Sequence, residues 1–236
     1  MQPGSEDSPG QSVHPRPGMS LLVRAGNLEY DRVLFFSDAI FAIAITLLVL
    51  EIPRGDVNQD IMKQLAAAHD HIIGFAISFV VIGMFWMAHH STFRYITMLD
   101  RRVVALNLLF CGLIAFLPYP TALLTEGSRS GPGATIFYAA CMTAVGLVET
   151  AVWLYASQAN RLTPGLTATE RHYVAARVVR VPVVFGLSIP VALVSAAAGQ
   201  YFWLMIGVSS VFIDRFFRTR LPSSGPEEAA GVGPVN

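Results

Sequence analysis

Apolar residues along this chain gather in long blocks that are separated by short polar segments. Six blocks are about 17–25 residues long and carry few charges, which is the length that an α-helix needs to cross a bilayer. They are Val33–Ile52, Ile72–Ser91, Val103–Leu124, Ala134–Ala156, Val178–Ala198 and Tyr201–Phe217. The pattern predicts an all-α fold, an integral membrane bundle of six helices.

The two ends of the chain lack such blocks. Residues 1–27 and 221–236 are rich in Pro, Gly and Ser, and the first stretch holds no apolar core typical of a signal peptide. Segments of this composition bury too little apolar surface to offset the entropy lost on ordering. We therefore expect a disordered N-terminal tail at 1–27, a six-span membrane domain at 28–220 and a disordered C-terminal tail at 221–236.

Composition agrees with a membrane protein, because hydrophobic residues make up 53% of the chain and charged residues only 14%. The net charge of zero hides an uneven distribution of basic residues. Alternate connections and both termini carry thirteen arginines, whereas the remaining loops carry three basic residues. The thirteen are Arg16, Arg24, Arg32, Arg94, Arg101, Arg102, Arg161, Arg171, Arg177, Arg180, Arg215, Arg218 and Arg220. The three are Arg54, Lys63 and Arg129. The positive-inside rule then predicts that both termini are cytoplasmic.

Topology is a sufficient reason for these arginines, so we expect no polyanion or lipid-specific site and no nucleic-acid partner. Cys111 and Cys141 fall in the middle of apolar blocks, where cysteine acts as a small packing residue. The chain has no HExxH, CxxC pair or phosphate-binding glycine loop. We therefore expect neither an enzyme nor a resident cofactor or metal.

The first block contains a Ser37-Asp38 pair a few residues inside its start. An aspartate at membrane depth costs roughly 2.5–3.5 kcal/mol on insertion scales, so Asp38 is a candidate functional residue. At 100° per residue, Ile43, Leu47 and Leu50 form an aliphatic stripe, and Asp38 points about 140° away from Ile43. Taken alone, such a stripe is typical of ordinary helix packing.

Asp38 needs a hydrogen-bond partner, and Arg32 lies on another face of the same helix. The end of the second block offers Trp86, His89 and His90, which share one helical face at a matching depth. Indole and imidazole N–H groups are suitable donors to a buried carboxylate. Two alternatives remain open for the histidines: a metal or haem ligand pair in a redox protein, and interfacial residues without a special role.

Three further polar features lie in the later blocks. Asn107 is typical of a side chain that links helices in a membrane. Pro118 and Pro120 are expected to kink or end the third helix. Glu149 is the second acid at membrane depth, and the sequence leaves it open between a packing residue and a proton carrier.

The run from Arg32 to Phe36, Ser37 and Asp38, followed by AIFAIAITLLVLEI, resembles the RxxxFSD signature of the transmembrane protein 175 family of potassium channels, in its six-span prokaryotic branch. The blocks FWMAHHSTF and LNLLFCGLIAFLPYPTAL are similar to the second and third helices of that family. The resemblance covers about residues 28–125. Later residues agree only in the number of spans.

The resemblance implies a homotetramer in which four copies of the first helix line the pore, without a glycine-rich filter loop. It implies that Ile43 forms the narrowest ring, that Leu47 and Leu50 form further rings, and that potassium passes transiently near Ile43 and the Thr46 hydroxyl. The implied polar network holds the pore helices together and comprises Arg32, Phe36, Ser37, Asp38, Trp86, His89 or His90, and Asn107. Spacing favours His90, which follows Trp86 by four residues.

The resulting expectation is a potassium-permeable cation channel in a bacterial plasma membrane. Potassium ions, the lipid bilayer and further copies of the chain are its expected partners. Conduction would be passive, through a hydrophobic constriction that discriminates by the cost of partial dehydration. The alternative is a proton-coupled secondary transporter that uses Asp38 and Glu149.

Overall fold

The computed structural model describes residues 17–53, 55, 60–126, 132–158 and 161–218, with side chains from residue 29 onward. The chain forms two compact units, residues 1–36 and 37–236, and the boundary falls within the first helix. The expected C-terminal tail at 221–236 lies outside the described residues, and so do residues 1–16 of the expected N-terminal tail. Residues 17–27, which the sequence assigned to the N-terminal tail, are helical.

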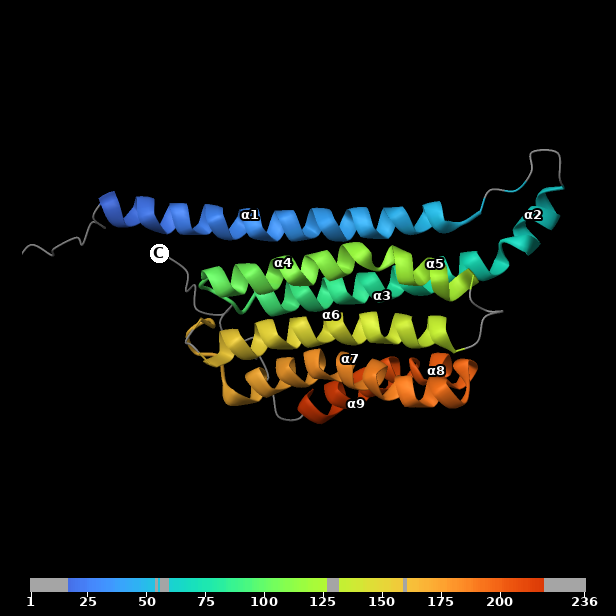
Figure 1. Ribbon diagram of the computed structural model, residues 1–236. Coiled ribbons are helices and arrows are strands. Elements are labelled where there is room, and N and C mark those ends of the chain that lie inside the picture. The colour runs from blue at the N-terminus through green and yellow to red at the C-terminus, as the bar shows by residue number, and fades with distance from the viewer. Residues whose placement is uncertain (1–16, 54, 56–59, 127–131, 159–160, 219–236) are drawn as a thin grey trace, which may run out of the picture. The chain divides into compact units, whose positions relative to one another are not determined.

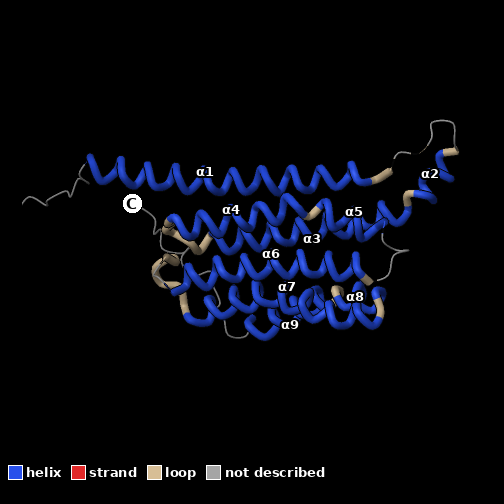
Figure 2. Tube along the Cα trace, in the orientation of Figure 1, coloured by secondary structure: helices blue, strands red, loops and turns tan. Residues whose placement is uncertain are grey.

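The described chain consists of helices joined by loops (Figure 2). Their bounds are α1 Pro17–Leu47, the 3₁₀ turn η1 Leu48–Glu51, α2 Ile61–Ala67, α3 His69–Phe93, α4 Arg101–Phe116, α5 Pro118–Glu126, α6 Gly133–Gln158, α7 Ala168–Val194, α8 Ala196–Phe202 and α9 Met205–Arg218. Among the described residues, six helical segments are long and apolar enough to cross a membrane: Glu29–Glu51, His69–Phe93, Arg101–Glu126, Gly133–Gln158, Ala168–Val194 and Ala196–Arg218. The prediction of an all-α protein with six spans is confirmed.

The fifth and sixth spans differ from the sequence-based boundaries. Helix α7 begins at Ala168, well before the predicted start at Val178, and a capping box between Thr167 and Glu170 fixes this start. Arg171, Arg177 and Arg180, which the sequence assigned to a connection, therefore lie within α7. The sixth span is divided into α8 and α9 rather than being one helix.

The third span breaks where its prolines predict. Helix α4 ends at Phe116, and α5 begins at Pro118. A proline has no N–H to give to the preceding turn, and it is well tolerated at the first position of a helix. The prediction that Pro118 and Pro120 interrupt the third helix is confirmed, and both prolines are buried.

Helix α6 is central to the second unit: it packs on α7 along one side and on α4 and α5 along the other (Figure 1). A continuous apolar core joins these helices to α3, and it includes Ile82, Phe110, Ile114, Tyr138 and Met142. Helix α6 approaches α7 closely at Gly146. A Cβ atom there would lie 2.6 Å from Cδ of Pro182 and 2.9 Å from its backbone nitrogen, so only glycine fits without a shift of the helices.

Candidate functional site

A chain of buried polar side chains links three helices of the second unit. Ser37 of α1 is fully buried, and its Oγ accepts a hydrogen bond of 2.9 Å from Nδ2 of Asn107 in α4. Oδ1 of Asn107 lies 2.8 Å from Nε2 of His89 in α3. Because this amide oxygen can only accept, His89 donates from Nε2, which assigns its tautomer.

Asp38 is held by the neighbouring helix. Nε1 of Trp86 in α3 donates a 2.8 Å hydrogen bond to Oδ1 of Asp38. The His90 ring stacks on Trp86 with 5.8 Å between ring centroids and an interplanar angle of 29°. The two neighbouring polar contacts, Ser37 with Asn107 and Asp38 with Trp86, connect α1 to both α4 and α3.

The sequence favoured His90 as the histidine of this network, but the structure differs. His89 makes the hydrogen bond to Asn107, whereas His90 is exposed and stacks on the Trp86 ring. Adjacent residues of a helix point about 100° apart, so the two histidines cannot serve the same face. Spacing from Trp86 alone did not reveal which face turns inward.

His89 lies within an aromatic cluster. Its ring is parallel to that of Phe110 at 5.3 Å between centroids, and it stacks on Phe93 at 4.3 Å. Phe41 approaches at 5.7 Å. Within the described part of the chain, no group of three or more His, Cys, Asp or Glu side chains could hold a metal ion. The arrangement positions His89 as a buried donor between helices.

The aliphatic stripe of the first helix faces away from the core of its own subunit. Ile43, Leu47 and Leu50 are 57%, 41% and 65% exposed. On the opposite side of the same segment, Phe41, Ala44 and Leu48 are each 1% exposed and belong to the core. The segment thus presents one buried face and one uncovered apolar face.

Thr46 lies beside this stripe and is exposed. Its Oγ1 donates a 2.9 Å hydrogen bond to the carbonyl of Ile43, within the same helix. The hydroxyl oxygen keeps lone pairs available to another donor or to a cation.

The α-helical geometry assumed for the stripe ends at Leu47, because Leu48–Glu51 form a 3₁₀ turn. A 3₁₀ turn has three residues, so side chains three apart eclipse each other. Leu50 is therefore aligned along the axis with Leu47, instead of being rotated by the roughly 60° that a regular α-helix would give. The tighter turn keeps the aliphatic positions on one side of the segment.

The remaining residues of the signature, Arg32 and Phe36, belong to the first unit. The hydrogen bonds described above are formed entirely by residues of the second unit. Our expectation that Arg32 and Phe36 join the same polar network stays a prediction.

Glu149 is 3% exposed on α6, and neither of its carboxylate oxygens has a hydrogen-bond partner among the described residues. The charges that act on it are those of Arg180 and Arg177 in α7. Asp38, in contrast, is bonded to α3. The structure thus gives the two acids of the transporter hypothesis different partners on different helices.

A polar cluster at one end of the bundle was not predicted. Asp100 caps α4 by accepting a 2.9 Å hydrogen bond from the Val103 N–H, and its Oδ2 accepts bonds from the Tyr155 hydroxyl at 2.6 Å and from Arg161 at 2.7 Å. The guanidinium of Arg161 also lies 4.4 Å from the centroid of the Tyr155 ring. The bonds from Tyr155 and Val103 lower the pKa of Asp100 to about 2. An aspartate directly before an apolar run is a helix-cap signal, but nothing in the sequence identified its partners.

The same end is closed by backbone pairing. Ile96 and Leu162 form an isolated antiparallel bridge, in which the Thr97 N–H donates to Arg161 and the Thr163 N–H donates to Tyr95, both at 2.8 Å. Backbone hydrogen bonds thereby join the α3–α4 connection to the α6–α7 connection.

The described residues, with six membrane-capable helices, a buried polar network on the first of them and an uncovered aliphatic face, define a multi-pass α-helical membrane protein. The family model described as "Endosomal/lysosomal potassium channel TMEM175" matches residues 32–118. A protein of Streptomyces collinus named as a potassium channel is 36% identical over 194 residues, which cover 78% of this chain and 94% of that protein. The chain belongs to the TMEM175 family of ion channels.

Further relatives agree with this assignment. A protein of Chamaesiphon minutus named as a potassium channel is 34% identical over 155 residues, covering 63% of this chain and 75% of that protein. The crystal structure of a lysosomal potassium-selective channel TMEM175 homolog from Chamaesiphon minutus has a TM-score of 0.60 at 29% identity, over 81% of this chain and 97% of that one. The relative from Gallus gallus is named an endosomal/lysosomal proton channel; it is 33% identical over 109 residues, and these cover 42% of this chain and 22% of that protein.

Proposed function

We propose that this protein is a potassium-permeable cation channel that conducts passively through a hydrophobic constriction. The constriction is formed by Ile43, Leu47 and Leu50 of the first helix, contributed by four subunits. The observation that carries the proposal is the uncovered aliphatic face of this helix, which lies opposite a face packed into the core. Two bacterial relatives named as potassium channels support the choice of ion.

The aliphatic rings act by controlling hydration. A narrow apolar constriction opens and closes to ions by wetting and dewetting, and it discriminates by the cost of partly stripping water from the ion. This cost is lower for potassium than for the more tightly hydrated sodium. The Thr46 oxygen beside Ile43 offers a ligand at the point where water is lost. Selectivity for potassium over sodium is therefore expected to be modest compared with a filter of carbonyl rings.

The polar contacts of Ser37 and Asp38 have a supporting role in this proposal. They attach the pore-lining helix to α4 and α3, and the attachment fixes which face of the helix turns toward the other subunits. Arg32, Phe36 and His90 complete the assembly around the pore. Both termini lie on the cytoplasmic side of a bacterial plasma membrane, in agreement with the uneven distribution of basic residues along the chain.

The test is ion flux through liposomes that contain the purified protein, together with bi-ionic reversal potentials for potassium and sodium. The wild-type protein is expected to give passive flux with a reversal potential that favours potassium. Ile43→Asn is expected to hydrate the constriction, to increase flux and to bring the potassium-to-sodium permeability ratio closer to one.

Ile77→Asn is the matched control, because Ile77 is likewise exposed on its helix, α3, and the chemical change is the same. It is expected to leave the reversal potential unchanged. A reversal potential that Ile43→Asn does not alter would contradict the proposed constriction. Saturable flux that requires a proton gradient and is lost in Glu149→Gln would contradict the channel and support the proton-coupled transporter.

A further inference from the structure

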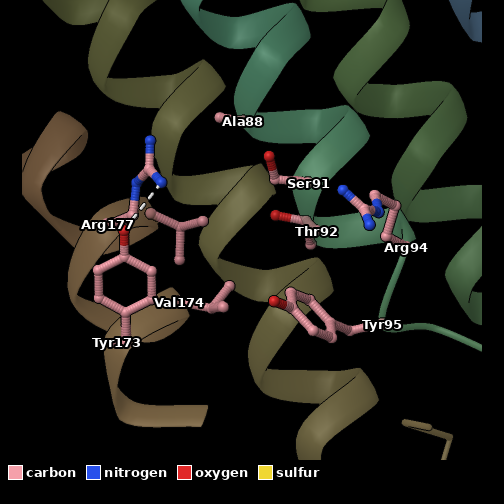
Figure 3. A pocket seen from close by; sticks show the side chains of 9 residues that line it. Ala88, Ser91, Thr92, Arg94, Tyr95, Tyr173, Val174 and Arg177 are labelled. Carbon is pink, nitrogen blue, oxygen red and sulfur yellow. Dashed lines mark hydrogen bonds between the residues drawn. The ribbon is translucent and has the colours of Figure 1, made fainter. Parts of the chain in front are cut away.

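A small cavity of about 110 Å³ opens between the end of α3 and the first turns of α7 (Figure 3). It is far in the sequence from the residues assigned to the pore, and no part of the proposed conduction path uses it. Its lining combines three kinds of side chain: two arginines, four hydroxyl-bearing residues and three small apolar residues. These are Arg94 and Arg177; Ser91, Thr92, Tyr95 and Tyr173; and Ala88, Val174 and Val178.

The lining contains two arginines and no acid. Within the described part of the chain neither Arg94 nor Arg177 forms an ion pair. Arg177 is instead held in place by Tyr173, whose hydroxyl accepts a 3.1 Å hydrogen bond from Nη1. The Tyr173 hydroxyl in turn donates to Asp214 of α9 at 2.9 Å. Arg177 is therefore positioned by a hydroxyl that is itself bonded to the Asp214 carboxylate, and its charge also acts on Glu149. Its remaining guanidinium N–H groups can donate to an anion.

The hydroxyl groups come from the facing helix. Figure 3 shows the Ser91 and Thr92 hydroxyls projecting from α3 toward the side on which Tyr173 and Arg177 lie. Thr92 is 2% exposed, so its hydroxyl is available to this cavity rather than to bulk solvent. Two guanidinium groups with nearby hydroxyl donors are the set of groups that binds phosphate oxygens in proteins.

The position of the cavity along the helices identifies the source of such a phosphate. The membrane-capable part of α3 ends at Phe93, and that of α7 begins at Ala168. The cavity thus lies at the end of the membrane-capable part of α3, where an apolar interior meets the headgroups. On α7 its lining runs from Tyr173 to Val178, and Arg177 lies deeper along the helix than Val174. We propose that this cavity binds the phosphate of an anionic phospholipid, whose acyl chains remain in the bilayer beside α3 and α7.

The experiment measures lipid binding by the delipidated full-length protein in native mass spectrometry. Phosphatidylglycerol is the probe, phosphatidylcholine tests the need for net negative charge, and inorganic phosphate tests a soluble ligand. We expect saturable binding of one phosphatidylglycerol per subunit. Arg94→Gln combined with Arg177→Gln is expected to weaken this binding about thirtyfold, since each arginine near the surface contributes on the order of 1 kcal/mol.

Arg101→Gln combined with Arg171→Gln is the matched control. These arginines are exposed and lie at the same end of the bundle, outside the cavity, so the change in net charge is the same. Ala88→Leu fills the apolar part of the cavity without altering charge, and it is expected to weaken binding as well. Retained α-helical circular dichroism in each variant shows that folding is intact.

Three outcomes would overturn the proposal. Equal losses of phosphatidylglycerol binding in the two double variants would mean that only the general surface charge attracts the lipid. Equal binding of phosphatidylcholine would remove the role of the arginines in recognising an anion. Competition by inorganic phosphate at the same concentration as the lipid would make the ligand a free anion, and not a phospholipid. None of these results bears on ion flux, so the channel proposal is tested independently.

Discussion

Three buried polar side chains at the site bond to one another across helices, which makes their burial tolerable. Ser37, Asn107 and His89 form such a set, and each uses a donor or acceptor that would otherwise be unsatisfied in an apolar surrounding. Asn107 is the central member, since its amide bonds to both of the others. Its loss would remove two buried hydrogen bonds at once.

Asn107→Ala is therefore expected to lower the free energy of unfolding by about 1–2 kcal/mol, the range for a buried polar pair left incomplete in a membrane protein. The measurement is denaturant or thermal unfolding in a fixed detergent. Leu108→Ala is the control, because Leu108 is 51% exposed on the same helix and should cost much less. Equal losses in both variants would show that the amide network contributes nothing measurable.

The carboxylate of Asp100 makes the stability of the folded protein depend on pH, and a substitution of this one residue tests that dependence. Its pKa is lowered from an ordinary value of 3.8 to about 2, chiefly by the Tyr155 hydroxyl. A lowered pKa in the folded state means that the charged form contributes stability above about pH 4, and that this contribution is lost as the pH falls toward 2. Asp100→Asn is expected to show a smaller fall in melting temperature between pH 4 and pH 2 than the wild-type protein. An unchanged pH profile would contradict this role.

The sequence predicted the polar positions of the site better than their pairing. Asp38 and Trp86 stand out as polar groups at matching depth, and the structure has a hydrogen bond between them. The choice between His89 and His90 depends on how far α3 rotates about its axis, which is set by the packing of Phe93 and Phe110. Rotation of this kind leaves no trace in residue spacing.

Helix boundaries in this protein follow local hydrogen bonding more closely than hydropathy. The start of α7 was placed at Val178 because charged residues interrupt the apolar run before it. The capping box of Thr167 and Glu170 nevertheless begins the helix at Ala168, and this signal is present in the sequence as the run TATE. The break between α4 and α5 at Leu117 was predicted, because the prolines that follow it both signal the break in the sequence and cause it in the structure.

The contact between α6 and α7 gives a prediction at the scale of helices. Gly146→Ala would place a methyl group against the backbone of Pro182, and it is expected to destabilise the protein by about 1–3 kcal/mol. Gly112→Ala is the matched control, since a Cβ atom there meets no other atom within 4 Å. The control is expected to be neutral, or to stabilise by up to about 1 kcal/mol through helix propensity.

Unfolding of the two variants in the same detergent measures this difference. A Gly146→Ala protein as stable as Gly112→Ala would show that α6 and α7 can separate slightly without loss. Purification yield and retained helicity check that both variants fold.

At the scale of the whole molecule, the proposed channel needs other copies of the chain. In that proposal, Ile43, Leu47 and Leu50 of several subunits surround one axis. We expect native mass spectrometry to give a homotetramer.

Asp38→Ala is expected to reduce the tetramer fraction severalfold, because the first helix then loses its bond to Trp86 and with it a fixed orientation toward the axis. Asp70→Ala is the control, since Asp70 is exposed and pairs with the adjacent His69. A wild-type monomer would contradict the tetramer. An intact Asp38→Ala tetramer would contradict the role of the hydrogen bond between Asp38 and Trp86 in assembly.

The backbone bridge between Ile96 and Leu162 also bears on the order of assembly during synthesis. Residues 95–97 leave the ribosome early, whereas Arg161 and Thr163 follow only after the whole of α6 has been made. The nascent chain must therefore insert its second and third spans with this connection still open and Asp100 still lacking its partners Tyr155 and Arg161. Arrival of the fourth span closes the connection, so the first half of the bundle reaches its final form only when the second half has begun to enter the membrane.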